Sequence, residues 1–247
     1  DAIADAGYDY VGISIDGLEE THDQIRQRRG AFRESMAAVR LCKERDIKVG
    51  LRFTLTRDNY AQFDDILSLT AEHDVDKFYL SHLNYGGRGH RHRKHDAWHE
   101  MTRDAMSRLF DRCRAELEAG IRREYVTGNN DADGPFLLHW ARRHFPERVA
   151  DLEARLLAWG GNASGEYIAN IDNLGNVHPD SFWWDHHLGN VRERPFSEIW
   201  CEADDDLMQG FRSRPRPLKG RCGACRYLPI CNGNTRVRAY NVSGDFW

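Results

Sequence analysis

The first third of the chain alternates between short β-rich runs and amphipathic helical segments, and this alternation restricts the fold more than any other feature. The expected strands are residues 10–15, 47–55 and 76–83. Between them, residues 31–45 and about 61–73 place apolar side chains at helical spacing. Strands joined by helices of this length form parallel βαβ units. We therefore predict an α/β fold, as a parallel sheet or a barrel.

Beyond residue 83 the pattern becomes mostly helical and then loop-rich. We expect a loop, a long amphipathic helix, a second loop and two further helices, over residues 84–95, about 97–119, 126–134, 135–145 and 147–159. The Gly-rich stretch at 160–165 ends this region. After it, residues 167–179 predict a hairpin around the tight turn of Asn173-Leu-Gly-Asn. We therefore place a domain boundary between residues 162 and 163.

The charge balance argues against two classes of partner. The 35 basic and 39 acidic residues leave a net charge of −4, which favours neither nucleic acid nor an anionic membrane surface. No apolar run approaches the roughly 20 residues that a membrane-spanning helix needs. The N-terminal residues show no signal-peptide pattern. We therefore expect a cytoplasmic protein with no nucleic-acid or membrane partner.

Both ends of the sequence predict a piece of a longer protein. Residues 1–9 have no initiator methionine and are typical of the end of a helix that leads through Gly7 into a strand. The last residues, VSGDFW, stop on two aromatic side chains, whereas native termini are usually polar and loosely held. We therefore expect further sequence on both sides.

Three cysteines near the C-terminus form the sharpest local signal, with the spacing Cys222-x2-Cys225-x5-Cys231. Thiolates at this spacing can converge on one centre, and soft thiolates select zinc or iron–sulfur clusters over hard cations. A zinc site usually closes with a second Cys-x2-Cys pair, which is absent here. A disulfide framework is typical of small secreted proteins. We favour an iron–sulfur cluster and keep the zinc ribbon and the disulfide framework as alternatives.

The fourth ligand of such a cluster stays open. Cys201 is one candidate, although its helical surroundings fit a buried structural thiol equally well. Further candidates are three histidines, His178, His186 and His187. We favour a cysteine beyond Trp247. Cys42 and Cys113 lie within amphipathic helices and are interpreted as core residues.

Several runs of sequence resemble a known family. The runs Ser14-Ile-Asp16-Gly17-Leu18, Thr21-His22-Asp23 and Arg28-Arg29-Gly30-Ala31-Phe32 resemble the middle strand and loop of radical S-adenosylmethionine (SAM) proteins. The three-cysteine spacing resembles the core of their C-terminal auxiliary-cluster extension, of the SPASM or twitch type. Longer runs resemble the branch that acts in haem d1 biosynthesis and its relative that decarboxylates iron-coproporphyrin, at residues 84–89, 127–134, 156–165, 171–180, 188–200 and 221–239.

The resemblance implies a fold and a set of binding residues. Residues 1–162 would form the C-terminal half of a partial (β/α) barrel, and residues 163–247 a small cysteine-rich α+β auxiliary-cluster domain, incomplete at its end. Its cofactors would be SAM and an auxiliary 4Fe-4S cluster. The SAM-binding residues would be Ser14, Asp16, Arg52 and Leu83, the last at the start of a loop that reaches Gly87. The cluster ligands would be Cys222, Cys225 and Cys231.

One departure from the family pattern limits what this chain can do alone. The Cys-x3-Cys-x2-Cys motif, which binds the cluster that reduces SAM, is nowhere in the sequence. The resemblance places it, with a second 4Fe-4S cluster, upstream of the first expected strand. We therefore predict no catalytic residue within this chain and no activity of the fragment by itself.

The function implied is that of an enzyme acting on tetrapyrrole propionate side chains in haem d1 biosynthesis, with a didecarboxysirohaem-type substrate. Its electron donor would be a reductant such as flavodoxin or ferredoxin. Three alternatives stay open: the radical decarboxylase of iron-coproporphyrin, a peptide-modifying SPASM protein, and a non-catalytic iron–sulfur or zinc binding module. The basic segment 88–95 is interpreted as a solvated loop and helix start, and Trp183 and Trp184 as packing residues.

Overall fold

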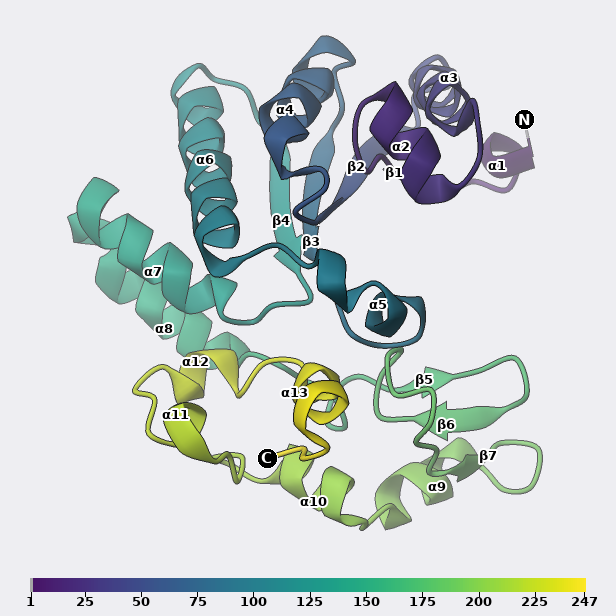
Figure 1. Ribbon diagram of the computed structural model, residues 1–247, viewed down its shortest axis with the longest axis vertical. Coiled ribbons are helices and arrows are strands. Elements are labelled where there is room, and N and C mark those ends of the chain that lie inside the picture. The colour runs from purple at the N-terminus through teal and green to yellow at the C-terminus, as the bar shows by residue number, and fades with distance from the viewer. Residues whose placement is uncertain (1) are drawn as a thin grey trace. The chain divides into compact units, whose positions relative to one another are not determined.

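The computed structural model describes residues 2–247 and consists of two compact units (Figure 1). The first unit comprises residues up to Leu83 together with His95–Gly128. The second comprises Asn84–Lys94 and Asn129–Trp247. The predicted domain boundary between residues 162 and 163 falls inside the second unit, and it stays a prediction.

A four-stranded parallel sheet forms the centre of the first unit, in the order β1-β2-β3-β4. The three strands expected from the sequence are present as β1 (Tyr10–Ser14), β2 (Lys48–Leu55) and β3 (Lys77–His82). Successive strands are joined by the expected helices, α3 (Ala31–Lys43), α4 (Phe63–Glu72) and α6 (His99–Glu118), with a single 3-10 turn, η1 (Tyr60–Gln62), ahead of α4. The predicted parallel α/β arrangement is confirmed.

One face of this sheet forms the core of the unit. On β2, the alternate residues Val49, Leu51, Phe53 and Leu55 are at most 1% exposed. The ring of Phe53 lies 5.7 Å from that of Phe63 on α4, which anchors the helix to the sheet. The intervening residues of β2 point to the opposite face, as the two-residue period of a strand requires.

Two local predictions for the first unit and its neighbouring loop were wrong, and one helix was missed. Residues 126–128 belong to a strand, β4 (Glu124–Gly128), because hydrogen bonding to β3 stabilises an extended conformation that local composition does not favour. A helix, α2 (Glu19–Arg26), was missed after β1. The segment 84–95 contains short helical turns, α5 (Arg88–Arg91) and η2 (Arg93–His95), rather than a continuous loop. A short N-terminal helix, α1 (Ala2–Asp5), precedes β1.

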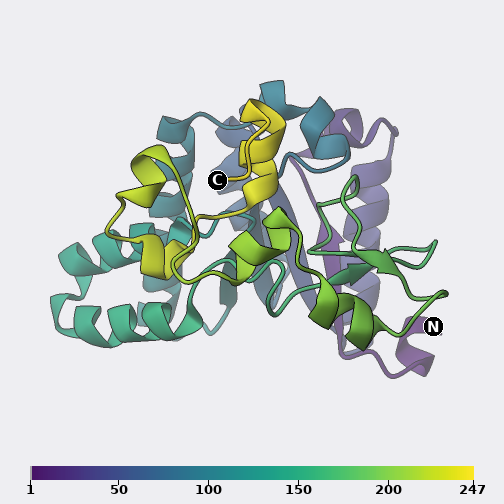
Figure 2. The same ribbon diagram turned by 90° about the horizontal axis from the view of Figure 1, so that it is seen from below.

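The second unit is built from short elements. Helices α7 (Asp133–His144) and α8 (Val149–Trp159), linked by η3 (Pro146–Arg148), lie side by side (Figure 2). The expected hairpin is present as the antiparallel pair β5 (Asn170–Ile171) and β6 (Asn176–His178), and β7 (Gly189–Asn190) adds a third strand. Five short helices follow: α9 (Phe196–Glu202), α10 (Asp206–Arg212), α11 (Gly220–Gly223), α12 (Leu228–Cys231) and α13 (Arg236–Ser243).

The core of the second unit includes the C-terminal aromatics. Trp183, Phe211 and Val237 are buried, and Phe246 and Trp247 pack against them. The ring of Trp247 lies 5.7 Å from that of Phe211 in an edge-to-face arrangement. The packing role predicted for Trp183 is therefore observed, whereas Trp184 is 55% exposed.

Candidate functional site

The three clustered cysteines lie on one compact segment of the second unit. Cys222 is on α11, Cys225 follows it, and Cys231 ends α12. The backbone N–H of Cys225 donates to the carbonyl of Cys222 at 3.1 Å, which closes a tight turn between them. Cys222 and Cys225 are exposed, whereas Cys231 is only partly exposed.

The charges around the three thiols influence one another. Burial raises the pKa of Cys231, and the negative charges of Asp131, Cys225 and Cys222 raise it further. Burial lowers the pKa of Arg236, and the charges of Cys222 and Cys231 oppose that shift. The positive charge of Arg236 therefore favours the ionised form of these two thiols.

Three thiols on one short segment have the ligand chemistry that an iron–sulfur cluster requires. Within residues 2–247, no three His, Cys, Asp or Glu side chains are grouped closely enough to hold one ion. The ligands of a cluster bind different iron atoms and are therefore spaced further apart than the ligands of one ion. Three thiolates on one segment supply three of the four that a 4Fe-4S cluster takes.

The other candidates for the fourth ligand have different surroundings. His178 is buried; its Nδ1 lies 2.8 Å from the carbonyl oxygens of Trp183 and His186, and its Nε2 lies 3.3 Å from Asp172. Both ring nitrogens therefore already have protein partners. Cys201 is exposed on α9, which excludes the alternative that it is a buried structural thiol. A cysteine beyond Trp247 stays a prediction.

Two of the predicted SAM-binding residues share the polar face of the first unit's sheet. Ser14, the last residue of β1, is the register partner of Arg52 on β2. The Arg52 guanidinium lies 4.8 Å from the ring centre of Tyr79 on β3 and remains exposed. A Cβ at Gly12 would lie 3.1 Å from Arg52 Cδ, so the glycine leaves room for this side chain. Both residues are therefore available to a ligand on this face.

Asp16 occupies a different position from Ser14 and Arg52. Its carboxylate is buried, lies 2.5 Å from the Arg26 guanidinium and accepts a hydrogen bond from the backbone N–H of Thr54. Its own backbone N–H donates to His22 Nδ1 at 2.9 Å, and burial lowers the pKa of that imidazole. The contacts of Asp16 join the ends of β1 and β2. Its contact with SAM stays a prediction.

Leu83 directly follows β3, and the loop after it packs within the second unit. The Tyr85 carbonyl accepts a hydrogen bond from the Asn241 side chain at 2.9 Å. The Arg238 guanidinium lies 4.6 Å from the centre of the Tyr85 ring. Asn241 and Arg238 are both on α13, so the predicted adenine loop is tied to the helix that follows the cysteine segment.

Sequence reasoning missed the aromatic side chains of the polar sheet face. The hydroxyl of Tyr10 lies over Gly50, and that of Tyr79 lies over Gly128. Lys77 Nζ lies 4.8 Å from the centre of the Tyr10 ring. Glycine within a strand marks close approach by another group, and this signal was available from the sequence.

Comparison with known protein families gives two matches, in two different parts of the chain. Residues 1–70 match the model of the radical SAM superfamily. Residues 164–226 match SPASM, described as an iron–sulfur cluster-binding domain. Two different parts of the chain thus match a radical SAM model and an iron–sulfur cluster-binding model. No helix within residues 2–247 has the length and hydropathy needed to cross a membrane.

Two curated relatives align over almost the whole chain. Pre-heme d1 synthase of Dinoroseobacter shibae is 51% identical over 249 residues, covering 100% of this chain and 61% of the relative. Fe-coproporphyrin III synthase of Methanosarcina barkeri is 40% identical over 248 residues, covering 99% of this chain and 62% of the relative. This chain thus spans about three fifths of the length of these relatives.

A solved structure shows the same fold. The crystal structure of Streptococcus suis SuiB bound to the precursor peptide SuiA aligns with a TM-score of 0.60 at 15% identity. The alignment covers 92% of this chain and 49% of SuiB. This likeness confirms the predicted fold class.

Proposed function

We propose that this chain is the SAM-binding and auxiliary-cluster part of a radical SAM enzyme that acts on tetrapyrrole propionate side chains in haem d1 biosynthesis. The observation that carries the proposal is the 51% identity to pre-heme d1 synthase along the entire chain. The substrate proposed is of the didecarboxysirohaem type. The 40% identity to Fe-coproporphyrin III synthase supports a tetrapyrrole rather than a peptide substrate.

On the first unit, Arg52 would bind the methionyl carboxylate of SAM. A guanidinium binds a carboxylate through two parallel hydrogen bonds, and the Tyr79 ring restricts the Arg52 side chain before the ligand arrives. Ser14, its register partner, would offer a hydroxyl to the same ligand. Leu83 would lie by the adenine.

On the second unit, Cys222, Cys225 and Cys231 would hold the auxiliary 4Fe-4S cluster. When bound, such a cluster supplies one-electron transfer or a binding point for substrate. Arg236, whose positive charge favours the ionised forms of Cys222 and Cys231, would stabilise their thiolates. A reductant such as flavodoxin or ferredoxin would provide electrons to the whole enzyme, whose second cluster we place in the N-terminal part.

The experiment that tests this function uses the full-length enzyme, reconstituted with iron and sulfide without oxygen. It is incubated with SAM, dithionite and, in separate reactions, didecarboxysirohaem, iron-coproporphyrin or a peptide substrate. Mass spectrometry of the products is expected to show altered propionate side chains only for didecarboxysirohaem. Turnover of iron-coproporphyrin alone would favour the decarboxylase instead. Cleavage of SAM with no altered tetrapyrrole would contradict the proposal.

A further inference from the structure

The second unit contains a fully buried positive charge, that of the Arg216 guanidinium. The Arg216 side chain is 0% exposed, although it is not part of any regular element. Burial lowers its pKa to about 10, so it stays protonated at neutral pH. A buried guanidinium is costly unless all of its donors are satisfied, so its surroundings identify what it does.

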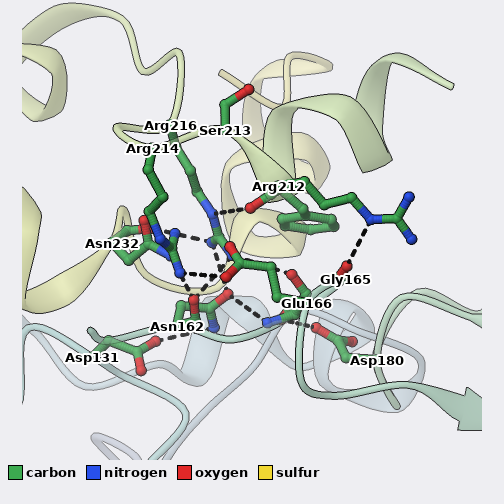
Figure 3. A network of polar contacts seen from close by, with 12 residues as sticks. Asp131, Asn162, Gly165, Glu166, Asp180, Arg212, Ser213, Arg214, Arg216 and Asn232 are labelled. Atoms are coloured by element: carbon green, nitrogen blue, oxygen red, sulfur yellow. Dashed lines mark hydrogen bonds and ion pairs between the residues drawn. The ribbon is translucent and has the colours of Figure 1, made fainter. Parts of the chain in front are cut away.

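All five N–H donors of Arg216 have acceptors (Figure 3). Nε donates to the carbonyl of Phe211 at 3.3 Å. One terminal nitrogen donates to Asn162 Oδ1 at 2.9 Å and to the carbonyl of Asn232 at 3.1 Å. The other donates to the carbonyls of Asn162 and Ser164, at 3.0 and 3.1 Å. The guanidinium therefore joins three segments that are distant in sequence.

One of these segments is the turn that begins directly after Cys231. Asn232 caps α12 in the left-handed conformation, and its side chain donates to the Asn162 carbonyl at 2.6 Å. The backbone N–H of Asn162 in turn donates to the Cys231 carbonyl at 3.3 Å. The Cys231 carbonyl thus accepts a hydrogen bond from Asn162. The carbonyl of the next residue, Asn232, accepts one from Arg216.

The packing at Cys231 is close as well as polar. A Cβ at Gly161 would lie 2.4 Å from the Ile230 carbonyl oxygen and 2.5 Å from the carbonyl carbon of Cys231. The backbone of residue 161 therefore rests directly on the Cys231 peptide. Cys222 and Cys225, by contrast, are exposed, and none of the Arg216 hydrogen bonds reaches them.

Carboxylates near the guanidinium balance its charge. Glu166 Oε1 lies 3.9 Å from Arg216, too far for a hydrogen bond, and Glu166 Oε2 lies 2.6 Å from Arg214. Asp131 accepts a hydrogen bond from the Asn162 side chain at 3.2 Å. Glu166 and Asp131 therefore offset the charge of Arg216 from a distance, without one tight ion pair. Its five donors bond to four backbone carbonyls and to Asn162 Oδ1.

We propose that Arg216 is a positioning residue for the auxiliary cluster: by holding Asn162 and Asn232 together, it fixes the place of the Cys231 thiolate. The inference rests on the proposed role of Cys231 as a cluster ligand. Arg216 would act only through the backbone that it binds, at Asn162 and Asn232. Groups that orient metal ligands in this way typically change metal affinity by about 10–100-fold when they are removed.

The test compares Arg216→Met with Arg212→Met in the full-length, anaerobically reconstituted enzyme. Arg212 is a matched control because it also binds backbone carbonyls in the second unit, those of Gly165, Ala203 and Trp200, but none in the cysteine segment. Both variants are expected to lower the thermal midpoint. Only Arg216→Met is expected to release the auxiliary cluster to a chelator, about ten-fold faster than wild type, and to change its electron paramagnetic resonance spectrum.

Two further substitutions, Arg216→Lys and Cys231→Ser, separate a failure of the Arg216 role from a failure of the proposed ligand set. If Arg216→Met does not fold, Arg216→Lys keeps the charge but loses the planar fork, and it is expected to show the same faster cluster release. Equal release and unchanged spectra in the Arg216 variants and Arg212→Met would overturn the inference. Cys231→Ser tests the underlying assignment separately. Retention of the auxiliary cluster in Cys231→Ser would contradict the proposed ligand set, whereas its loss there with unaffected Arg216 variants would contradict only the role of Arg216.

Discussion

The two compact units hold their candidate functional side chains in different ways. In the first unit, Ser14 and Arg52 are register partners in neighbouring strands, so the backbone ladder itself sets their spacing. In the second unit the strands have only two or three residues, and side-chain donors such as Arg216 bind the backbone around Cys231. The first unit should therefore tolerate changes at its polar face. The second should be sensitive to single changes around Cys231.

The largest expected effect is that of Gly161→Ala in the second unit. The new methyl group would meet the backbone at Ile230 and Cys231, which cannot rotate away, and φ at this position is +73°. We expect a loss of about 3 kcal/mol in the free energy of unfolding. The unfolding can be followed by tryptophan fluorescence, since six of the seven tryptophans belong to this unit.

The adjacent Gly160→Ala is the control for that prediction. Gly160 has φ +76°, but a Cβ there would meet no atom within 4 Å. Only the backbone strain remains, so we expect a loss of about 1 kcal/mol. Equal losses in the two variants would show that the close approach to Cys231 contributes nothing.

A smaller effect of opposite sign is expected for Asp131→Asn. Burial raises the pKa of Asp131 from 3.8 to about 6, so the folded state binds this proton more tightly than the unfolded state. This tighter proton binding stabilises the folded state below about pH 4, and the stabilisation is lost as pH rises through about 6. Asparagine removes this dependence, and the variant should be about 2 kcal/mol more stable than wild type at pH 7.

Denaturant unfolding at pH 4 and pH 7 measures this difference. At pH 4 the two proteins should be nearly equal in stability, because Asp131 is then protonated in the folded wild type. If the variant gains nothing at pH 7, the carboxylate is stabilised there by charges such as Arg216, and the second unit depends even more on this network.

In the first unit, we expect His22 to cause the opposite pH dependence of stability, with a smaller effect. Burial lowers its pKa below the ordinary 6.5, so the unfolded chain takes up a proton that the folded chain does not. The corresponding stability is present above about pH 6.5 and is lost as pH falls through the folded pKa. His22→Asn should reduce the loss of stability between pH 7 and pH 5. Hydrogen exchange of β1 and β2 measures it, and an unchanged pH slope would rule out His22 as its cause.

The smallest expected effect on stability is that of Arg52→Met. The exposed guanidinium contributes its contact with the Tyr79 ring, worth less than about 1 kcal/mol. The affinity of the full-length protein for SAM should nevertheless fall about ten-fold or more, because a charge-assisted hydrogen bond is lost. Lys48→Met, on the same strand and face, is the control. Equal SAM affinity in the two variants, measured by calorimetry, would remove Arg52 from the proposed site.

The sequence by itself determined the strands, the connecting helices and the cysteine segment. The period of apolar residues in β2 and α3 is a local property, and so is the spacing of Cys222, Cys225 and Cys231. Local composition misled where tertiary hydrogen bonding prevailed, as at β4, whose residues pair with β3 despite a turn-like sequence. It also missed the helix α2 and the short helical turns of residues 88–95.

Only the tertiary structure decided which polar residues are structural and which are open to a ligand. Asp16 and Arg52 look equivalent in the sequence, yet one is buried in an ion pair and the other is exposed on the sheet. The contacts of Arg216 join residues 162 and 232, which no periodicity relates. The physical reason is that a buried charge is stable only where the folded chain brings enough acceptors together, and that arrangement exists only after folding.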